Sequence, residues 1–317
     1  MRKAIIIEPN SNHFDYLAKE IKKYYNPYSF LFIGPTGHYV RQVSDKFAVL
    51  LGKTINKDSF MVINQYVTEK LLKNNMDAVY FDRDFLKAFI AEKVEELLKA
   101  HEKNIDSYYD FLRVVSRSKG IIDYILDLFE KAWELNNSEN IQIPTYYKEI
   151  ETILNQDGNL PKLLKELLRE IALFFQKTEN IFDPITTYKW YIENADFFEN
   201  QKETLVISGF FDLTPLVRKT LQKLFEKSQN VYFYVWQKIS DRAFKEIDEV
   251  YKFLEENNFQ IGEIKPIKLN LKTFTEGFSF KNPSSEIKNI CGKIKRLIIN
   301  GVKPGDIAVV APNNQIM

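Results

Sequence analysis

The chain passes from a strand-sized apolar run through a glycine-rich turn into a helical pattern at Phe30-Leu31-Phe32-Ile33-Gly34-Pro35-Thr36-Gly37-His38-Tyr39-Val40-Arg41. A turn in this position is where a P-loop would bind phosphate, through the pattern G-x-x-x-x-G-K-[ST]. Counted from Gly34, the second glycine, the lysine and the hydroxyl residue of that pattern fall on Tyr39, Val40 and Arg41. The stretch therefore predicts an α/β fold with either a degenerate nucleotide-binding turn or a turn without a ligand. The candidate nucleotide-binding residues are Gly34, Thr36, Gly37 and Arg41.

Apolar runs of the same kind recur along the chain, and helical patterns follow most of them. The other runs are Ala4–Ile7, Met61–Ile63, Leu205–Ser208, Val231–Trp236 and Ile307–Ala311. They are continuous rather than alternating, which is typical of strands buried on both faces of a parallel sheet. The pattern predicts a doubly wound parallel sheet.

Between residues 84 and 200 the strand-sized runs disappear, and amphipathic stripes at helical spacing take their place. The stripes lie at 86–98, 121–133 and 160–175. We therefore expect an all-helical domain inserted into the α/β domain, and a second α/β domain that begins near the end of the chain, as in the N-terminal part of a longer protein. The expected domains are 1–83 joined with 201–276, the insertion 84–200, and the truncated start of a second domain at 277–317.

The composition excludes several classes of function. The 317 residues carry 44 Lys and Arg against 43 Asp and Glu, so any nucleic-acid binding must come from a local surface. The single cysteine, Cys291, excludes a disulfide framework and a cysteine-ligated iron–sulfur cluster, and the three histidines show no metal-ligand spacing. No apolar run approaches the ~20 residues that span a bilayer. We expect a cytoplasmic protein without a metal site or a membrane partner.

A second motif accompanies the run at Leu205, in the segment Leu205-Val206-Ile207-Ser208-Gly209-Phe210-Phe211-Asp212-Leu213-Thr214-Pro215-Leu216. It resembles the Walker B region of superfamily 1 helicases, an apolar run followed by Asp-Glu-x-Gln-Asp and a threonine before a helix. The acidic pair that would hold magnesium is replaced by Ser208-Gly209, whereas Phe210, Asp212 and Thr214 keep the frame. Both halves of an ATP site are therefore expected to be degenerate.

The order of these motifs resembles one family, the B subunits of AddAB-type helicase–nucleases, also described as PD-(D/E)XK nuclease family proteins. Three further stretches carry the resemblance over nearly the whole chain. They are Val62–Leu72 at helicase motif Ia, Phe182-Asp183-Pro184 with Tyr188, Tyr191 and Ala195, and Ser285-Glu286-Ile287 through Gly301 to Asp306-Ile307-Ala308-Val309.

The resemblance implies a P-loop NTPase (RecA-like) fold that no longer acts as a motor. It implies a DNA-binding and scaffolding role within a helicase–nuclease that acts in double-strand break repair and recombination. The implied partners are single-stranded or duplex-end DNA and an A-type helicase/nuclease subunit in a heterodimer. The resemblance also implies that the nuclease, its magnesium and its iron–sulfur cluster belong to a C-terminal part of the family, which we do not expect within these 317 residues. We therefore expect no cofactor here and a lost ATP site.

The resemblance also implies where DNA would lie. Motif Ia falls on Asn64, Gln65 and Tyr66, which offer two amides and a ring for stacking. The alternative there is an ordinary helix start with Tyr66 packed. Motif III falls on Trp236 and Gln237, where a packed strand end is the alternative. Two alternative functions also stand: a P-loop-type nucleotide-binding ATPase that uses Arg41 in place of the lysine, and a pure assembly scaffold that binds no DNA.

Overall fold

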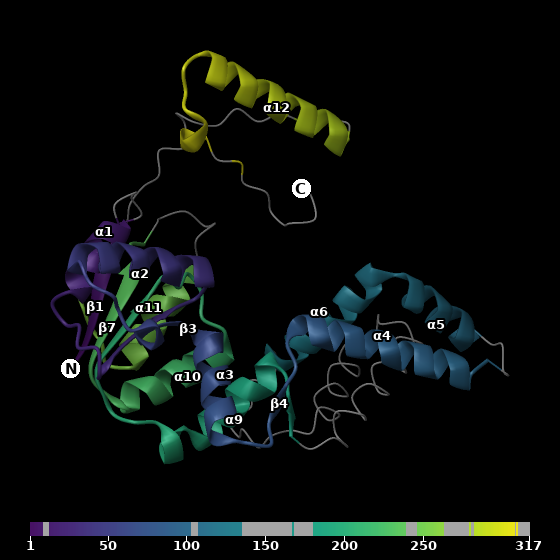
Figure 1. The fold of residues 1–317 in the computed structure, drawn as a ribbon, viewed down its shortest axis with the longest axis horizontal. Helices are drawn as coiled ribbons and strands as arrows, with labels where there is room; N and C mark the ends of the chain where they lie inside the picture. The colour runs from purple at the N-terminus through teal and green to yellow at the C-terminus, as the bar shows by residue number, and fades with distance from the viewer. Residues whose placement is uncertain are drawn as a thin grey trace. The chain divides into compact units, whose positions relative to one another are not determined.

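In a computed structural model, the chain forms a six-stranded parallel sheet with helices on both faces (Figure 1). The chain divides into two compact units, Met1–Lys268 and Leu269–Met317. The structure describes residues 1–8, 13–102, 107–134, 180–238, 246–262 and 282–307, together with positions 167, 279 and 309.

The central sheet has the strand order β3-β2-β6-β7-β1-β8. Its strands are β1 Arg2–Ile7, β2 Phe30–Gly34, β3 Phe60–Val62, β6 Lys202–Ser208, β7 Ser228–Trp236 and β8 Gln260–Ile261. Each neighbouring pair runs parallel, and β2 is buried at every position. The predicted α/β fold and the five predicted strands that lie in this unit are confirmed. The short edge strand β8 was not predicted, because two residues carry no apolar run.

Helices cover the two faces of the sheet, and the handedness of their connections decides which face each one takes. α1 (His13–Ile21) packs against α2 (Gly37–Leu51) on one face. On the other face α9 (Pro184–Phe198) packs against α3 (Ile63–Asn74) and α10 (Pro215–Glu226), as Figure 1 shows below the sheet.

The chain changes direction across the sheet between the neighbours β2 and β6. α2 leads from β2 outward to β3, whereas α10 leads from β6 the opposite way to β7. Because parallel crossover connections are right-handed, these two helices lie on opposite faces. The carboxyl ends of β2 and β6 therefore flank a topological switch point, where doubly wound sheets hold their ligands.

The inserted helices form a hydrophobic core of their own. They are α4 Arg83–Ala100, α5 Ser107–Arg117 and α6 Lys119–Glu134. Their buried side chains include Leu86, Ile90, Leu112 and Ile125. The stripes predicted at 86–98 and 121–133 are thus confirmed as parts of α4 and α6, whereas the stripe at 160–175 lies outside the described residues apart from Leu167.

Two features correct the expectation of an all-helical insertion between 84 and 200. β4 (Val79–Tyr80) pairs in parallel with β5 (Ile181–Phe182), so a small two-stranded sheet forms where the inserted segment leaves and returns. α9, at the end of the expected insertion, buries Tyr191 in the core of the main sheet. Neither feature has a strong local signal, since both depend on contacts between distant segments.

The second unit contains α12 (Pro283–Ile299), whose Asn282 cap accepts a hydrogen bond from the Ser285 amide at 2.9 Å. The helix covers most of the stretch from Ser285 to Gly301 that carries the family resemblance. The strand predicted at Ile307–Ala311 lies mostly outside the described residues. The division into the three predicted domains remains a prediction.

Candidate functional site

The turn that follows β2 is a tightly capped helix start. Only Pro35 and Thr36 connect β2 to α2. Thr36 is the N-cap, and its Oγ1 accepts a hydrogen bond from the backbone amide of Tyr39 at 3.3 Å. The first turn of α2 carries no acidic residue. The hydroxyl predicted to serve a nucleotide therefore caps the helix, which is the ordinary role of threonine at this position.

The side chain of Tyr39 covers the switch point between β2 and β6. Its ring lies against two glycines, because a Cβ added at Gly209 would be 2.7 Å from Cε1 of Tyr39, and one added at Gly34 would be 3.3 Å from Cδ1. Its hydroxyl shares a 2.8 Å hydrogen bond with Oγ of Ser208. Burial raises the pKa of Tyr39 to about 12, so the phenol is protonated at neutral pH. The ring thus occupies the crevice in which a doubly wound sheet would hold a ligand.

The two bonded residues are ones that the sequence comparison assigns to nucleotide-binding motifs. The expected alignment puts Tyr39 at the second glycine of a P-loop and Ser208 at the magnesium-binding acid of a Walker B strand. In the structure the Tyr39 ring fills the space between the two positions, and the Tyr39 hydroxyl is hydrogen-bonded to the Ser208 hydroxyl.

Aromatic side chains gather beside Tyr39 at the carboxyl ends of β1 and β7. Phe14 lies 5.3 Å from Tyr39 between ring centroids, and His13 lies 5.0 Å from Trp236. Phe211, in the loop after β6, stacks on Trp236 with centroids 5.2 Å apart and planes inclined by 10°. We call these five residues the carboxyl-edge aromatic cluster.

Phe211 is the exposed member of this cluster. Half of its surface, 51%, is open to solvent, whereas Trp236 is 7% exposed. The Trp236 Nε1 donor is buried and has no acceptor within the described ranges. Phe211 covers the Trp236 ring, which matches the alternative of a packed strand end, and DNA contact at Trp236 remains a prediction. Sequence reasoning missed Phe211, although its place directly after buried Phe210 marks a loop position where one of two adjacent aromatic rings must face outward.

Gln237 also behaves as a strand end. Its backbone amide donates to the Ile7 carbonyl at 2.9 Å, which extends the ladder between β7 and β1 by one residue. Its side chain is half-buried. Gln237 therefore matches the alternative of a packed strand end.

The residues predicted at motif Ia separate into an exposed pair and a buried ring. Asn64 and Gln65 are exposed, and Asn64 Oδ1 accepts a hydrogen bond from the Gln65 amide at 2.7 Å. Tyr66 is 3% exposed. Its hydroxyl donates to Oε1 of Glu199 at 2.6 Å. Tyr66 is thus packed, as in the alternative of an ordinary helix start, and DNA contact by Asn64, Gln65 and Tyr66 remains a prediction.

Three of the predicted site residues lie along one groove between α2 and β3, which we call the α2–β3 groove. It has a volume of about 480 Å³. Its lining consists of Gly37, Val40, Arg41, Ser44, Asp45, Ala48, Ile55, Lys57, Phe60, Val62 and Gln65. Gly37, Arg41 and Gln65 are thus brought together, but beside the helix rather than at the switch point. Gly34 and Thr36 do not contribute to the groove.

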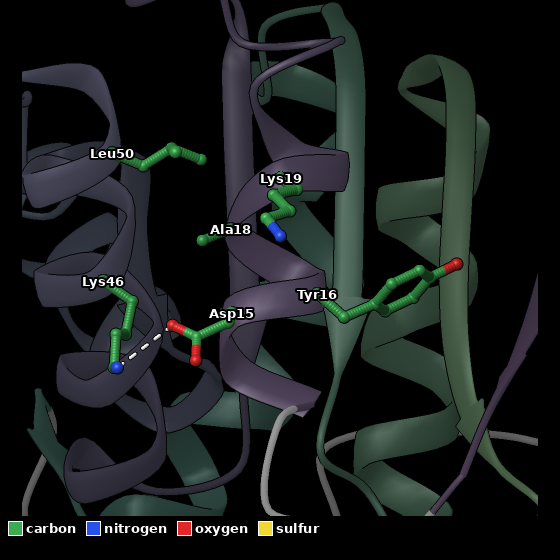
Figure 2. A pocket seen from close by; sticks show the side chains of 6 residues that line it. All are labelled: Asp15, Tyr16, Ala18, Lys19, Lys46 and Leu50. Carbon is green, nitrogen blue, oxygen red and sulfur yellow. Dashed lines mark ion pairs between the residues drawn. The ribbon is translucent and has the colours of Figure 1, made fainter.

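A second hollow of about 520 Å³ lies between α1 and α2 (Figure 2). Lys46 and Asp15 point toward each other across it and form an ion pair of 3.0 Å, whereas Tyr16 points away. Both charged side chains are about half exposed. The hollow holds no catalytic constellation, since its principal charges neutralise each other in solvent.

Within the described part of the chain, no group of three or more His, Cys, Asp or Glu side chains is arranged to hold a metal ion. No helix there is long and apolar enough to cross a membrane. No model of a known protein family matches the chain, and no curated protein is significantly similar to it.

Proposed function

We propose that this chain is the non-motor, helicase-like region of a helicase–nuclease subunit, with a RecA-like P-loop-type fold that binds and guides single-stranded DNA. The observation that carries the proposal is the filled switch point. A motor needs phosphates and magnesium between the P-loop and the Walker B strand, and here Tyr39 and Ser208 bond across that space. The motif order in the sequence supports the assignment to double-strand break repair with an A-type partner subunit.

The surface best suited to single-stranded DNA is the exposed face of Phe211. Base stacking on aromatic rings contributes about 1–3 kcal/mol per base and tolerates any sequence. The ring is held rigid from behind by its stacking on Trp236, so little conformational freedom is lost when a base is added. Exposed Asn64 and Gln65 follow β3 at the same carboxyl edge of the sheet and offer amides to the backbone of the strand.

Replacing Phe211 with alanine is expected to weaken the binding of single-stranded DNA by about 5- to 150-fold, which corresponds to the loss of one stacked base. Fluorescence anisotropy of a labelled oligothymidylate measures the effect. Tyr28→Ala is the matched control, because Tyr28 is 95% exposed and precedes β2, at the opposite edge of the sheet. Affinity should also fall steeply as salt concentration rises, since phosphate contacts release counterions.

If the wild-type chain binds no oligonucleotide at low salt, DNA binding is excluded and the assembly-scaffold function takes its place. If it binds, but Phe211→Ala and Tyr28→Ala behave alike, the DNA follows another path. The first result would reject DNA binding itself, whereas the second would reject only Phe211 as the binding site.

The ATPase alternative makes a distinct prediction about Arg41. If Arg41 replaced the P-loop lysine, phosphate release in the presence of magnesium would be measurable and Arg41→Ala would abolish it. We expect no phosphate release from either protein, because the Arg41 side chain lines the α2–β3 groove, whereas the switch point is filled by Tyr39.

A further inference from the structure

The loop between β6 and α10 presents a tip of two exposed residues, Phe211 and Asp212. The residues on either side of the tip, Phe210 and Leu213, are both buried. The backbone of the tip is therefore anchored from both sides, and the Phe211 ring is anchored by its stacking on Trp236. An exposed carboxylate is thus held directly beside an exposed aromatic ring.

The charge of Asp212 is not neutralised by a neighbouring cation. Asp212 forms no ion pair and no hydrogen bond in the part of the chain that the structure describes. Arg218 lies close to the same loop, but its Nε donates to the Leu213 carbonyl at 2.9 Å and its guanidinium pairs with Glu249. A free carboxylate repels phosphate groups, so beside a stacking ring it is suited to the edge of a base rather than to the backbone of a strand.

The edges of the four bases differ in what they offer to a carboxylate. An ionised carboxylate has two acceptor oxygens and no donor. Guanine carries two donors side by side on its Watson–Crick edge, N1–H and N2–H, which the two oxygens accept together in a bidentate pair. Thymine carries one N–H between two carbonyl oxygens, whereas adenine and cytosine each carry one amino group beside an acceptor nitrogen. A carboxylate therefore favours guanine among the bases of a single strand, whose Watson–Crick edges are open to contact.

We propose that Phe211 and Asp212 together select guanine in single-stranded DNA. The ring stacks on the face of the base, and the carboxylate accepts hydrogen bonds from N1–H and N2–H at its edge. The two contacts are compatible because neighbouring Cα atoms are about 3.8 Å apart and a base that stacks on one residue extends sideways past the next. The inference rests on the proposed binding of single-stranded DNA at Phe211 and adds a base preference to it.

Thymidylate heptamers that carry one substituted nucleotide at the centre test the preference, with affinity measured by fluorescence anisotropy. Guanine at the centre is expected to bind the wild-type chain about fivefold or more tightly than thymine, as a bidentate base contact does. Hypoxanthine stacks like guanine but lacks the N2 amino group, so it should lose most of this gain. 7-Deazaguanine keeps the Watson–Crick edge and should retain the gain.

Asp212→Asn is the variant that isolates the carboxylate, because it replaces one acceptor oxygen with a donor at nearly constant size. It should abolish the preference for guanine, whereas the all-thymidine heptamer should bind as before or slightly more tightly, since a negative charge is removed. Asp58→Asn is the matched control. Asp58 is also exposed, but it lies directly before β3, at the opposite edge of the sheet.

The role of Asp212 is overturned if the guanine preference survives Asp212→Asn or if hypoxanthine shares it in full. It is also overturned if the wild-type chain binds all the heptamers equally, a result that leaves the proposed binding of single-stranded DNA in place. A chain that binds neither the heptamers nor longer oligothymidylate at low salt would overturn the proposed function together with this inference.

Discussion

Replacing Glu199 with alanine is expected to lower the free energy of unfolding by about 3–5 kcal/mol, the range found when one partner of a buried ion pair is removed. The Glu199 side chain is 0% exposed and pairs with Lys70 at 3.0 Å. It also accepts hydrogen bonds from the hydroxyls of Tyr66 at 2.6 Å and Tyr191 at 3.0 Å. Alanine would leave these donors buried beside an empty space, and each unmade bond adds a desolvation cost.

The position of Glu199 explains why so many partners converge on it. Tyr66 and Lys70 lie on α3, before the chain enters the inserted helices, whereas Tyr191 lies on α9, where the chain has returned. The carboxylate therefore joins the two helices that bracket the insertion. Its loss should loosen α3 against α9 as well as lower the midpoint of thermal unfolding.

Asp196→Ala is the matched control for Glu199→Ala. Asp196 lies on α9, three residues before Glu199, and pairs with Lys223 at 2.8 Å, but its side chain is 52% exposed. Exposed pairs contribute little to stability, so this variant should unfold in urea almost as the wild type does. Equal losses for the two variants would show that the buried carboxylate does not hold α3 to α9.

The central sheet could be predicted because each of its longer strands carries its own signal. β2, β6 and β7 are continuous apolar runs, and parallel strands that are buried on both faces require such runs. The helices α2 and α10 carry a similar signal, because apolar residues recur at helical spacing after the runs that form β2 and β6. Nothing local marked β4 and β5, because each contributes two residues and pairs across the whole insertion.

The contacts of the candidate site could not be predicted in the same way. Tyr39 and Ser208 are 169 positions apart, and Tyr66 and Glu199 are 133 apart. The motif comparison identified the departures at Tyr39 and Ser208, but a linear pattern gives no reason for the two to meet. That reason lies in the strand order, which sets β2 beside β6 and pairs Ile33 with Ile207 one step before the turn.

Replacing Gly209 with alanine is expected to destabilise the protein by about 2–5 kcal/mol, from two separate causes. Its φ of 94° lies in the region that L residues rarely adopt, at a cost of about 1–2 kcal/mol. The new Cβ would also lie 2.7–2.9 Å from three carbons of the Tyr39 ring, and overpacking of this kind costs about 1–3 kcal/mol. The ring cannot withdraw easily, because its hydroxyl is bonded to Ser208.

A double-mutant cycle separates the two causes. In a Tyr39→Ala background, Gly209→Ala should cost only the backbone part, about 1–2 kcal/mol, because no ring remains to collide with the added methyl group. Gly37→Ala is the control in wild-type Tyr39, since a Cβ there meets nothing within 4 Å. If Gly209→Ala costs the same in both backgrounds, Tyr39 does not press on the switch point. The ring would then be free to move away from the crevice between β2 and β6.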